Sequence, residues 1–236
     1  MNADSGALLG VWAHPDDEAY LSAGLMAQAR GAGRRVVVVT ATRGEHGTDD
    51  PTTWPPDRLG PLRERELEAS LATVGVHEHR WLTHRDGELA GVPLDAGVAD
   101  LVPVLEQVRP DVVVTFGPDG MTGHPDHRAV SVWTTEAWRR TGGQARLWYA
   151  TLTPDFHEEW GELNDEVGLW TATPPVTPAP ALSAQVRLAG AQLDRKHRAL
   201  RAHASQTRGL EELVGAATYR RWWSTESFVS AEAAAV

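Results

Sequence analysis

Residues 35–42 read RVVVVTAT, a run in which four valines follow one another with no polar residue between them. β-Branched side chains favour strands, and a strand that is apolar at successive positions is buried on both faces. Such burial is typical of the interior of a parallel sheet that helices cover on both sides. We therefore expect residues 35–42 to form an interior strand of a parallel sheet.

The segments around this run alternate between strand and helix patterns. Further strands are expected at residues 7–13, 79–83, 111–116 and 146–152, and helices at residues 18–30, 61–74, 94–108 and 127–140. Strands that alternate with helices form parallel sheets with right-handed crossovers. The sequence therefore predicts an α/β fold with a doubly wound, mostly parallel Rossmann-like sheet. In the strand order 3-2-1-4-5, the first and fourth strands would be neighbours.

The pattern changes after residue 152. Residues 154–180 are rich in tryptophan and proline, and we expect them to be an irregular covering segment. A strand near residues 184–188 and helices at residues 189–203 and about 210–222 are expected to follow, and residues 224–236 are expected to fray. We interpret residues 1–236 as a single domain, with a core at about 7–152 and a Trp/Pro-rich C-terminal elaboration at about 153–223.

Composition argues against several kinds of partner. With 32 acidic and 22 basic residues, the formal net charge is −10, which disfavours nucleic acid or an anionic membrane as the main partner. The absence of cysteine excludes thiolate metal sites and cysteine nucleophiles. Because the chain shows no signal-peptide pattern and no run of about 20 apolar residues, we expect a cytoplasmic protein without membrane insertion. The sequence does not determine the oligomeric state, and a homo-oligomer is among the states that it allows.

Two of the expected loops carry the same His-Pro-Asp tripeptide. The loop after the first strand reads His14-Pro-Asp16-Asp17, and the loop after the fourth strand reads His124-Pro-Asp126-His127. In a doubly wound sheet, ligands bind beyond the carboxyl ends of the strands where the winding direction reverses. Helix capping alone could account for the acids of the first loop. Two loops that open into one crevice favour a ligand site instead.

The imidazole and carboxylate groups of the two loops are numerous enough to bind a metal ion that keeps an open coordination position. A catalytic Zn²⁺ is held by three protein ligands and water, and we assign His14, Asp17 and His127 as those ligands. Fe²⁺ or another divalent ion is the alternative. Asp16 and His124 then lie beside the metal, Asp16 as general base and His124 to stabilise an oxyanion or protonate a leaving amine.

The remaining acids of the two loops have supporting roles in this interpretation. Asp126 is placed behind a ligand histidine, which it would orient. Glu18 keeps the ordinary role of an acid in the first turn of a helix.

The two loops resemble the PIG-L/LmbE-like zinc-dependent deacetylases, which include GlcNAc-PI de-N-acetylases and the mycothiol and bacillithiol pathway deacetylases. The resemblance rests on AHPDDE at residues 13–18 and GHPDH at residues 123–127, with softer matches that extend to KHRALRAHASQ at residues 196–206. It implies the same three zinc ligands, the same general base and His124 as a charged group that faces the tetrahedral intermediate. It also implies that Arg63 and Asp86 contact sugar hydroxyls. Some members of the family carry a tyrosine where this chain has Thr122.

Residues outside the two loops have ordinary structural explanations. His203 lies near a helix end and is interpreted mainly as a capping histidine. The pair Trp222-Trp223 is interpreted as core or subunit contact. Trp160 and Trp170 are the better candidates for packing a sugar ring.

The sequence thus predicts a metal-dependent amide hydrolase that removes an acetyl or other acyl group from an N-acylated amino sugar or its glycoside. A non-haem Fe(II) oxygenase is one alternative, because two histidines and one carboxylate also describe its ligand set. A non-catalytic sugar- or metal-binding module is the other. The extra acid at Asp16 argues against the oxygenase, and an intact base argues against the binding module.

Overall fold

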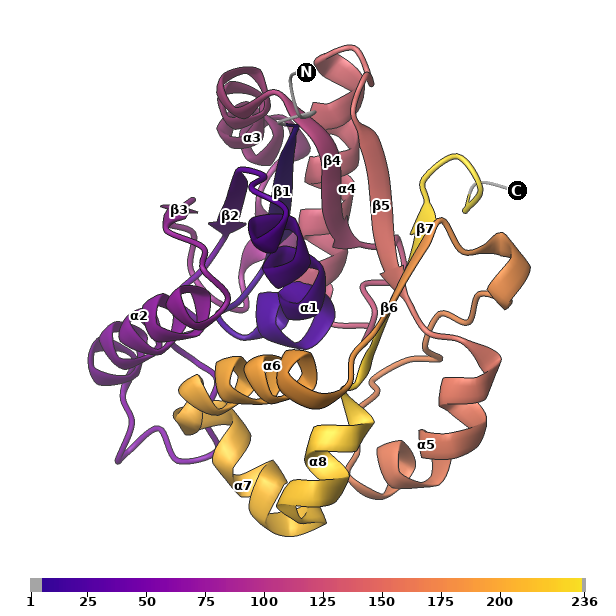
Figure 1. The fold of residues 1–236 in the computed structure, drawn as a ribbon. Coiled ribbons are helices and arrows are strands. Elements are labelled where there is room, and N and C mark those ends of the chain that lie inside the picture. Colours follow the sequence, from indigo (N-terminus) through magenta and orange to yellow (C-terminus); the bar gives the residue numbers. More distant parts are fainter. Residues whose placement is uncertain (1–5, 235–236) are drawn as a thin grey trace.

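The computed structural model describes residues 6–234, which contain one seven-stranded sheet in the order β3-β2-β1-β4-β5-β7-β6. The five expected strands are present, and each pairs in parallel with its neighbour. They are β1 (Ala7–Trp12), β2 (Val36–Thr40), β3 (Glu78–Trp81), β4 (Pro110–Phe116) and β5 (Arg146–Thr151). The doubly wound, mostly parallel fold and its 3-2-1-4-5 order are therefore confirmed (Figure 1).

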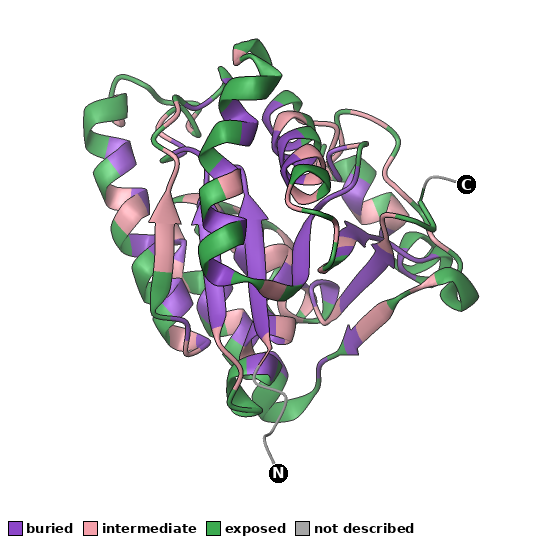
Figure 2. Cartoon of the chain, turned by 90° about the horizontal axis from the view of Figure 1, so that it is seen from above, coloured by how far each residue is buried: buried purple, intermediate pink, exposed green. Residues whose placement is uncertain are grey.

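Helices cover both faces of the sheet. The pair α1 (Asp17–Gly31) and α2 (Pro56–Thr73) lies on one face, and α3 (Leu94–Val108) and α4 (Pro125–Arg140) lie on the other (Figure 1). All residues of β1 and β2 are buried, as the valine run predicted, whereas the helices turn an exposed side to solvent (Figure 2). No helix within residues 6–234 has the length and apolar character that a membrane crossing requires.

The expected start of α2 was wrong by about one turn. The helix begins at Pro56, and Pro61 lies inside it instead of opening it. Proline is tolerated in the first turn because its missing N–H would have no partner there. A proline does begin the helix, as predicted, but the region contains several prolines and the one chosen from the sequence was not the first.

A further helix, α5 (Pro154–Glu166), occupies the first half of the segment that was expected to be irregular. Its N-terminus is capped by Thr153, whose Oγ1 accepts a hydrogen bond from Phe156 N at 3.3 Å. Phe156 and Trp160 are buried along one face of the helix. Only residues 167–183 remain largely irregular, with a short 3₁₀ turn at Ala179–Ala181.

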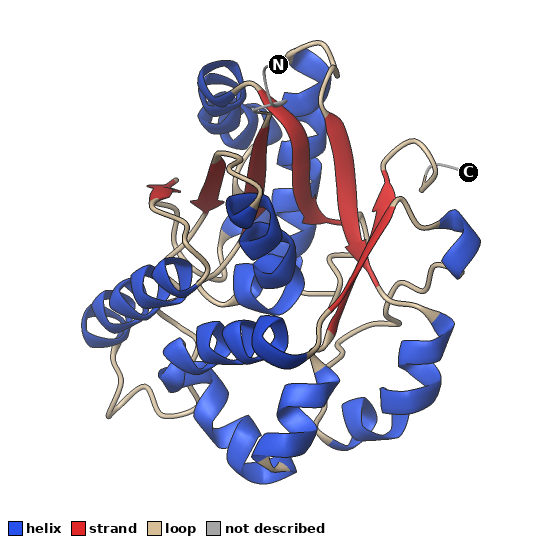
Figure 3. Ribbon diagram, viewed as in Figure 1, coloured by secondary structure: helices blue, strands red, loops and turns tan. Residues whose placement is uncertain are grey.

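The C-terminal part adds two strands to the sheet and three helices below it. These elements are β6 (Ala184–Arg187), α6 (Gly190–Ala202), α7 (Ala204–Val214), α8 (Ala216–Trp222) and β7 (Thr225–Ser230). The single helix expected at 210–222 is interrupted at Gly215, where φ is 83°. The expected fraying after residue 224 was also wrong, because β7 pairs antiparallel with both β5 and β6. Helices α5 to α8 gather beyond the carboxyl ends of the parallel strands (Figure 3).

A buried ion pair joins this C-terminal part to α1. Lys196 Nζ lies 2.7 Å from Glu226 Oε1 and donates to the carbonyl of Tyr20 at 2.6 Å. The Glu226 carboxylate also accepts the backbone N–H groups of Gly24 and Leu25. Both charges are therefore compensated inside the protein, as burial requires.

Candidate active site

The two His-Pro-Asp loops meet at the carboxyl ends of β1 and β4, as expected from the strand order. His14 lies in the turn between β1 and α1, and His127 lies in the first turn of α4. Both line a cavity of about 470 Å³, to which the C-terminal part also contributes lining residues. A larger hollow of about 1050 Å³ lies at the opposite ends of the strands, around Arg109, Pro110 and Arg146. Neither of the candidate metal-donor groups among the described residues lies there.

Three side chains converge at the base of the first cavity. His14 Nδ1 lies 3.2 Å from His127 Nε2, and each of these nitrogens faces one oxygen of Asp17. His127 Nε2 lies 3.3 Å from Asp17 Oδ1, and His14 Nδ1 lies 3.7 Å from Asp17 Oδ2. A tetrahedral metal ion bound at about 2.0–2.1 Å keeps its ligand atoms roughly 3.3 Å apart. The spacing of the donors on these three side chains is therefore close to that of a metal site.

The opposite ring nitrogens of the two histidines are already engaged. His127 Nδ1 donates to the carbonyl of Gly120 at 2.9 Å, and His14 Nε2 faces Asp86 at 3.1 Å and Asp126 at 3.4 Å. A carboxylate or carbonyl partner fixes the tautomer of a ligand histidine and leaves its other nitrogen free to bind metal. In both rings the free nitrogen is the one that faces the other donors.

The site calls for a positive charge. Burial opposes protonation of His14, but hydrogen bonds to Asp126 and Asp86 and the charge of Asp17 outweigh it and raise its pKa to about 10. The three carboxylates around His14 therefore favour a positive charge at this place. When no metal is bound, the charge is that of the protonated imidazole of His14. A divalent ion would satisfy the same charge.

Other groupings of donors exist at the same place. His124 has a ring nitrogen within 4.8 Å of ligand atoms of His14 and His127, and Asp86 and Asp126 form a second group around His14. We favour the set with Asp17, because Asp17 Oδ1 faces His127 Nε2 at 3.3 Å, whereas Nδ1 of His124 is occupied by the backbone N–H of Asp126. The carboxylates of Asp86 and Asp126 are occupied by backbone N–H groups. Asp126 is fully buried and accepts backbone N–H groups from the loop at 87–89, in addition to facing His14.

His124 caps α4 and lines the cavity. Its Nδ1 accepts the backbone N–H of Asp126 at 3.1 Å, so the neutral ring carries its proton on Nε2. Burial and the nearby His14 lower its pKa, so the structure favours the neutral ring over the cation considered from the sequence. The neutral ring can still donate one hydrogen bond to a ligand in the cavity.

Asp16 lies beside the converging donors, in a backbone conformation that few non-glycine residues adopt. Its φ is 110°, and its N–H is held by Glu18 Oε2 at 2.9 Å. Its Oδ2 accepts a hydrogen bond from Arg63 Nη2 at 3.2 Å. Burial raises the pKa of Asp16 to about 6, against the opposing effect of Arg63. Strained backbone of this kind is concentrated at functional sites.

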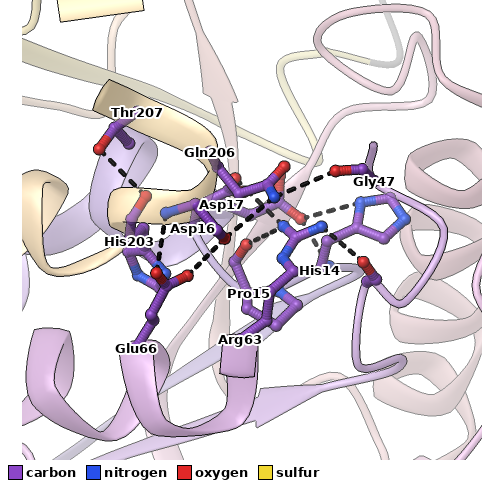
Figure 4. Close-up of polar contacts among 12 residues, drawn as sticks. His14, Pro15, Asp16, Asp17, Gly47, Arg63, Glu66, His203, Gln206 and Thr207 are labelled. Carbon is purple, nitrogen blue, oxygen red and sulfur yellow. Dashed lines mark hydrogen bonds and ion pairs between the residues drawn. The ribbon is translucent and has the colours of Figure 1, made fainter. Parts of the chain in front are cut away.

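Arg63 reaches the site from α2 and is almost fully buried (Figure 4). Besides Asp16, its guanidinium donates to the carbonyls of Gly44 and Pro15. Gly44 has φ of 61°, and a Cβ there would lie 2.3 Å from Arg63 Nη1, so this glycine makes room for the guanidinium. These contacts position Asp16, and contact with a sugar stays a prediction.

Asp86 is likewise engaged with the protein. One carboxylate oxygen faces His14, and the other accepts the backbone N–H of His46 at 2.9 Å. Both oxygens of the carboxylate therefore have partners within the protein, although the side chain also lines the cavity. Its contact with a sugar hydroxyl stays a prediction.

A buried polar network below Asp16 was missed from the sequence. Glu18 and His203 are both fully buried, and His203 Nε2 donates to Glu18 Oε1 at 2.7 Å. Ser70 Oγ donates to the same oxygen at 3.0 Å. The side chain of His203 thus pairs with Glu18 and makes no capping hydrogen bond, so the capping interpretation was wrong. Glu18 does more than open a helix. The only sequence signal was the softer family-like stretch that contains His203.

Replacing His203 with alanine should destabilise the protein by about 3–5 kcal/mol, because it leaves the buried Glu18 without its charged partner. Glu18 raises the pKa of His203 above 6.5 despite burial, so the stabilisation is complete below pH 6.5 and is lost as pH rises through the raised pKa. Urea unfolding of the metal-free protein at several pH values should show the difference from wild type shrinking toward alkaline pH. The matched control is H157A on the exposed side of α5, with no expected effect. An H203A protein as stable as wild type would contradict this account.

Comparison with known proteins agrees with the geometry. The family model for GlcNAc-PI de-N-acetylase (PIG-L) matches residues 9–138, more than half of the chain. The chain belongs to the PIG-L family.

Among its relatives in this family are deacetylases of 1D-myo-inositol 2-acetamido-2-deoxy-α-D-glucopyranoside. The protein from Acidothermus cellulolyticus is 34% identical over 85% of this chain and 79% of its own length. The one from Saccharomonospora viridis is 37% identical over 60% of this chain and 61% of its own length. This chain thus covers less than two thirds of several such relatives.

Solved structures show the same fold. The N,N′-diacetylchitobiose deacetylase from Pyrococcus horikoshii has a TM-score of 0.67 and 22% identity, over 98% of this chain and 85% of its own. A 4-carboxy-2-hydroxymuconate hydratase from Pseudomonas putida also matches, with a TM-score of 0.62 and 16% identity. At such identity, structural likeness shows the PIG-L fold and leaves the chemistry to be argued from the site.

The PIG-L match contains both His-Pro-Asp loops and ends before the tryptophans of the C-terminal part. Of the two sugar-platform candidates, Trp160 is buried in the core against Trp222 and does not line the cavity, so that interpretation was wrong. Trp170 does line the cavity. Trp222 and Trp223 both belong to the core as expected, and Trp223 also lines the cavity.

Proposed function

We propose that this PIG-L protein is a zinc-dependent N-deacetylase, which removes the acetyl group from an N-acetylated amino sugar or its glycoside. The observation that carries the proposal is the convergence of three metal donors within 3.2–3.7 Å, beside a carboxylate that is not needed as a ligand. His14, Asp17 and His127 would hold the ion. When bound, such an ion polarises the amide carbonyl and acidifies water.

The protein's own groups supply the proton transfers. Asp16, positioned by Arg63 and by the backbone contact with Glu18, accepts a proton from the attacking water. His124 presents Nε2–H to the cavity, where it donates to the oxyanion that develops from the carbonyl. The proton taken by Asp16 then passes to the leaving amine, and acetate is the second product.

The substrate assignment is supported by the polar part of the cavity and by the relatives' names. His46, Gly47 and Gln206 line the cavity beside Arg63 and Asp86 and offer donors and acceptors for hydroxyl groups. The relatives named above act on 2-acetamido sugars. Cytoplasmic location and oligomeric state remain predictions.

The two alternatives from the sequence differ from this proposal in measurable ways. An Fe(II) oxygenase would consume oxygen and would have no use for a carboxylate base beside the metal. A binding module would hold an acetamido sugar without cleaving it. Asp16, which has a strained backbone and is held by Arg63 and Glu18, favours hydrolysis over both.

The proposal is tested by metal removal. Protein stripped with a chelator should release no amine or acetate from N-acetylglucosamine and its glycosides. Adding back one equivalent of Zn²⁺ should restore equal amounts of both products, and parallel additions of Fe²⁺ and other divalent ions identify the preferred metal. A chelated protein with undiminished turnover, or a zinc-loaded protein inactive on every acetamido sugar, would overturn it.

A further inference from the structure

The cavity above the metal donors has a polar part and an apolar part. Four of its apolar side chains come from the C-terminal part, and we call them the apolar wall: Leu169, Trp170, Leu210 and Trp223. Leu21 and Met121 add further apolar lining from the N-terminal part. Trp170 follows α5, Leu210 lies on α7, and Trp223 follows α8. Three separate C-terminal segments therefore bring large apolar groups to the cavity that also contains the polar groups of the site.

The segment with Trp170 is anchored to the loop between β4 and α4. Thr171 donates to the carbonyl of Thr122 twice, from its N–H at 2.9 Å and from its hydroxyl at 2.8 Å. Gly123 permits this close approach, since a Cβ there would lie 2.7 Å from Ala172 Cβ. Trp170 is thus held at the cavity by contacts of its neighbours.

The opposite end of the wall is also fixed. The ring of Trp223 stacks on Trp222 with ring centroids 4.8 Å apart and meets the ring of Tyr20 edge-on at 4.6 Å. Tyr20 in turn is hydrogen-bonded to Tyr219 at 2.8 Å. The wall is therefore a preformed surface, not a set of loose side chains.

All four residues of the wall lie outside residues 9–138, which the family model matches, whereas the metal donors and Asp16 lie inside. Removal of an acetyl group is common to the relatives' names, but the group attached to the sugar differs, being inositol in one case and a second sugar in the other. The wall, which lies outside the matched part, is therefore a candidate contact for the group that varies.

We propose that this enzyme acts on N-acetylglucosaminides whose aglycone is apolar, with the aglycone packed against the apolar wall. The inference rests on the proposed function. A hydroxyl-covered aglycone such as inositol would lose hydrogen bonds to water against these side chains, which is costly. An alkyl or aryl aglycone would gain from the same burial.

The test uses zinc-loaded protein with methyl, butyl and hexyl glycosides of N-acetylglucosamine. A fully buried methylene is worth about fourfold in binding, so kcat/KM should rise roughly tenfold or more from the methyl to the butyl glycoside. Trp170→Ala and Leu210→Ala should bring this ratio toward one. The matched control is Leu213→Ala on the same helix, where the side chain is 72% exposed and the ratio should be unchanged.

Several outcomes would overturn the inference while deacetylation stands. These are equal kcat/KM for all glycosides, a ratio that Trp170→Ala does not change, and an increase on lengthening the N-acyl group instead of the aglycone. Calorimetric binding of the same glycosides separates the two proposals. Tighter binding of the butyl glycoside, lost in Trp170→Ala, would support the wall even if no glycoside were cleaved. If neither glycoside binds, the wall proposal fails.

Discussion

Replacing Asp16 with asparagine should lower kcat for deacetylation by about 10²–10⁴-fold while leaving the bound metal at one equivalent. Asparagine matches the shape of aspartate, and its side-chain oxygen can still accept the hydrogen bond from Arg63 that Asp16 accepts at 3.2 Å. It cannot take a proton from water. The expected loss therefore reports the proton transfer and not the architecture of the site.

The measurement combines steady-state kinetics on methyl N-acetylglucosaminide with metal analysis of the same preparation. D57N is the matched control, because Asp57 also lies in the first turn of a helix but is exposed. It should keep full activity. An Asp16→Asn enzyme with wild-type kcat would remove Asp16 from the mechanism, and one that had lost its metal would make it part of the ion's binding site.

Replacing His127 with alanine should abolish stable metal binding and, with it, at least 10³-fold of the activity. His127 supplies the donor that lies 3.2 Å from His14 and 3.3 Å from Asp17. Two donors remain without it, one fewer than a catalytic zinc site uses.

Zinc titration followed by calorimetry measures this loss directly. His127→Ala should bind Zn²⁺ at least 10²-fold more weakly than wild type, and His157→Ala on exposed α5 should bind it normally. The same experiment on His124→Ala discriminates between the two donor sets, because our assignment predicts retained metal and reduced turnover there. Metal loss in His124→Ala with normal binding in Asp17→Ala would favour the grouping that contains His124.

Local pattern was enough to predict most of the sheet. The valine run became β2, buried at every position, and its neighbours formed in the expected order. Strand burial is read from a few consecutive residues, so it needs no knowledge of the rest of the chain. The last strand, β7, was not predicted, because its sequence TESFVS mixes polar and apolar residues. Its pairing partners are strands that lie far away in the sequence.

The candidate site divides in the same way. The approach of His14 to His127 followed from strand order, because the loops after two adjacent parallel strands must open on one side. The partners of the ligand histidines could not be deduced like this. Asp86 reaches His14 from a loop after β3, and only side-chain geometry decides which oxygen faces which nitrogen.

By itself, the sequence determined the parallel sheet, the two His-Pro-Asp loops and the metal chemistry that they suit, because each depends on residue type and short-range order. Only the tertiary structure decided that Glu18 pairs with His203 across 185 residues and that Trp170, not Trp160, borders the cavity. Those contacts depend on how α5 to α8 pack over the carboxyl ends of the strands. Packing of distant segments is set by the whole set of buried surfaces, and no local pattern encodes it.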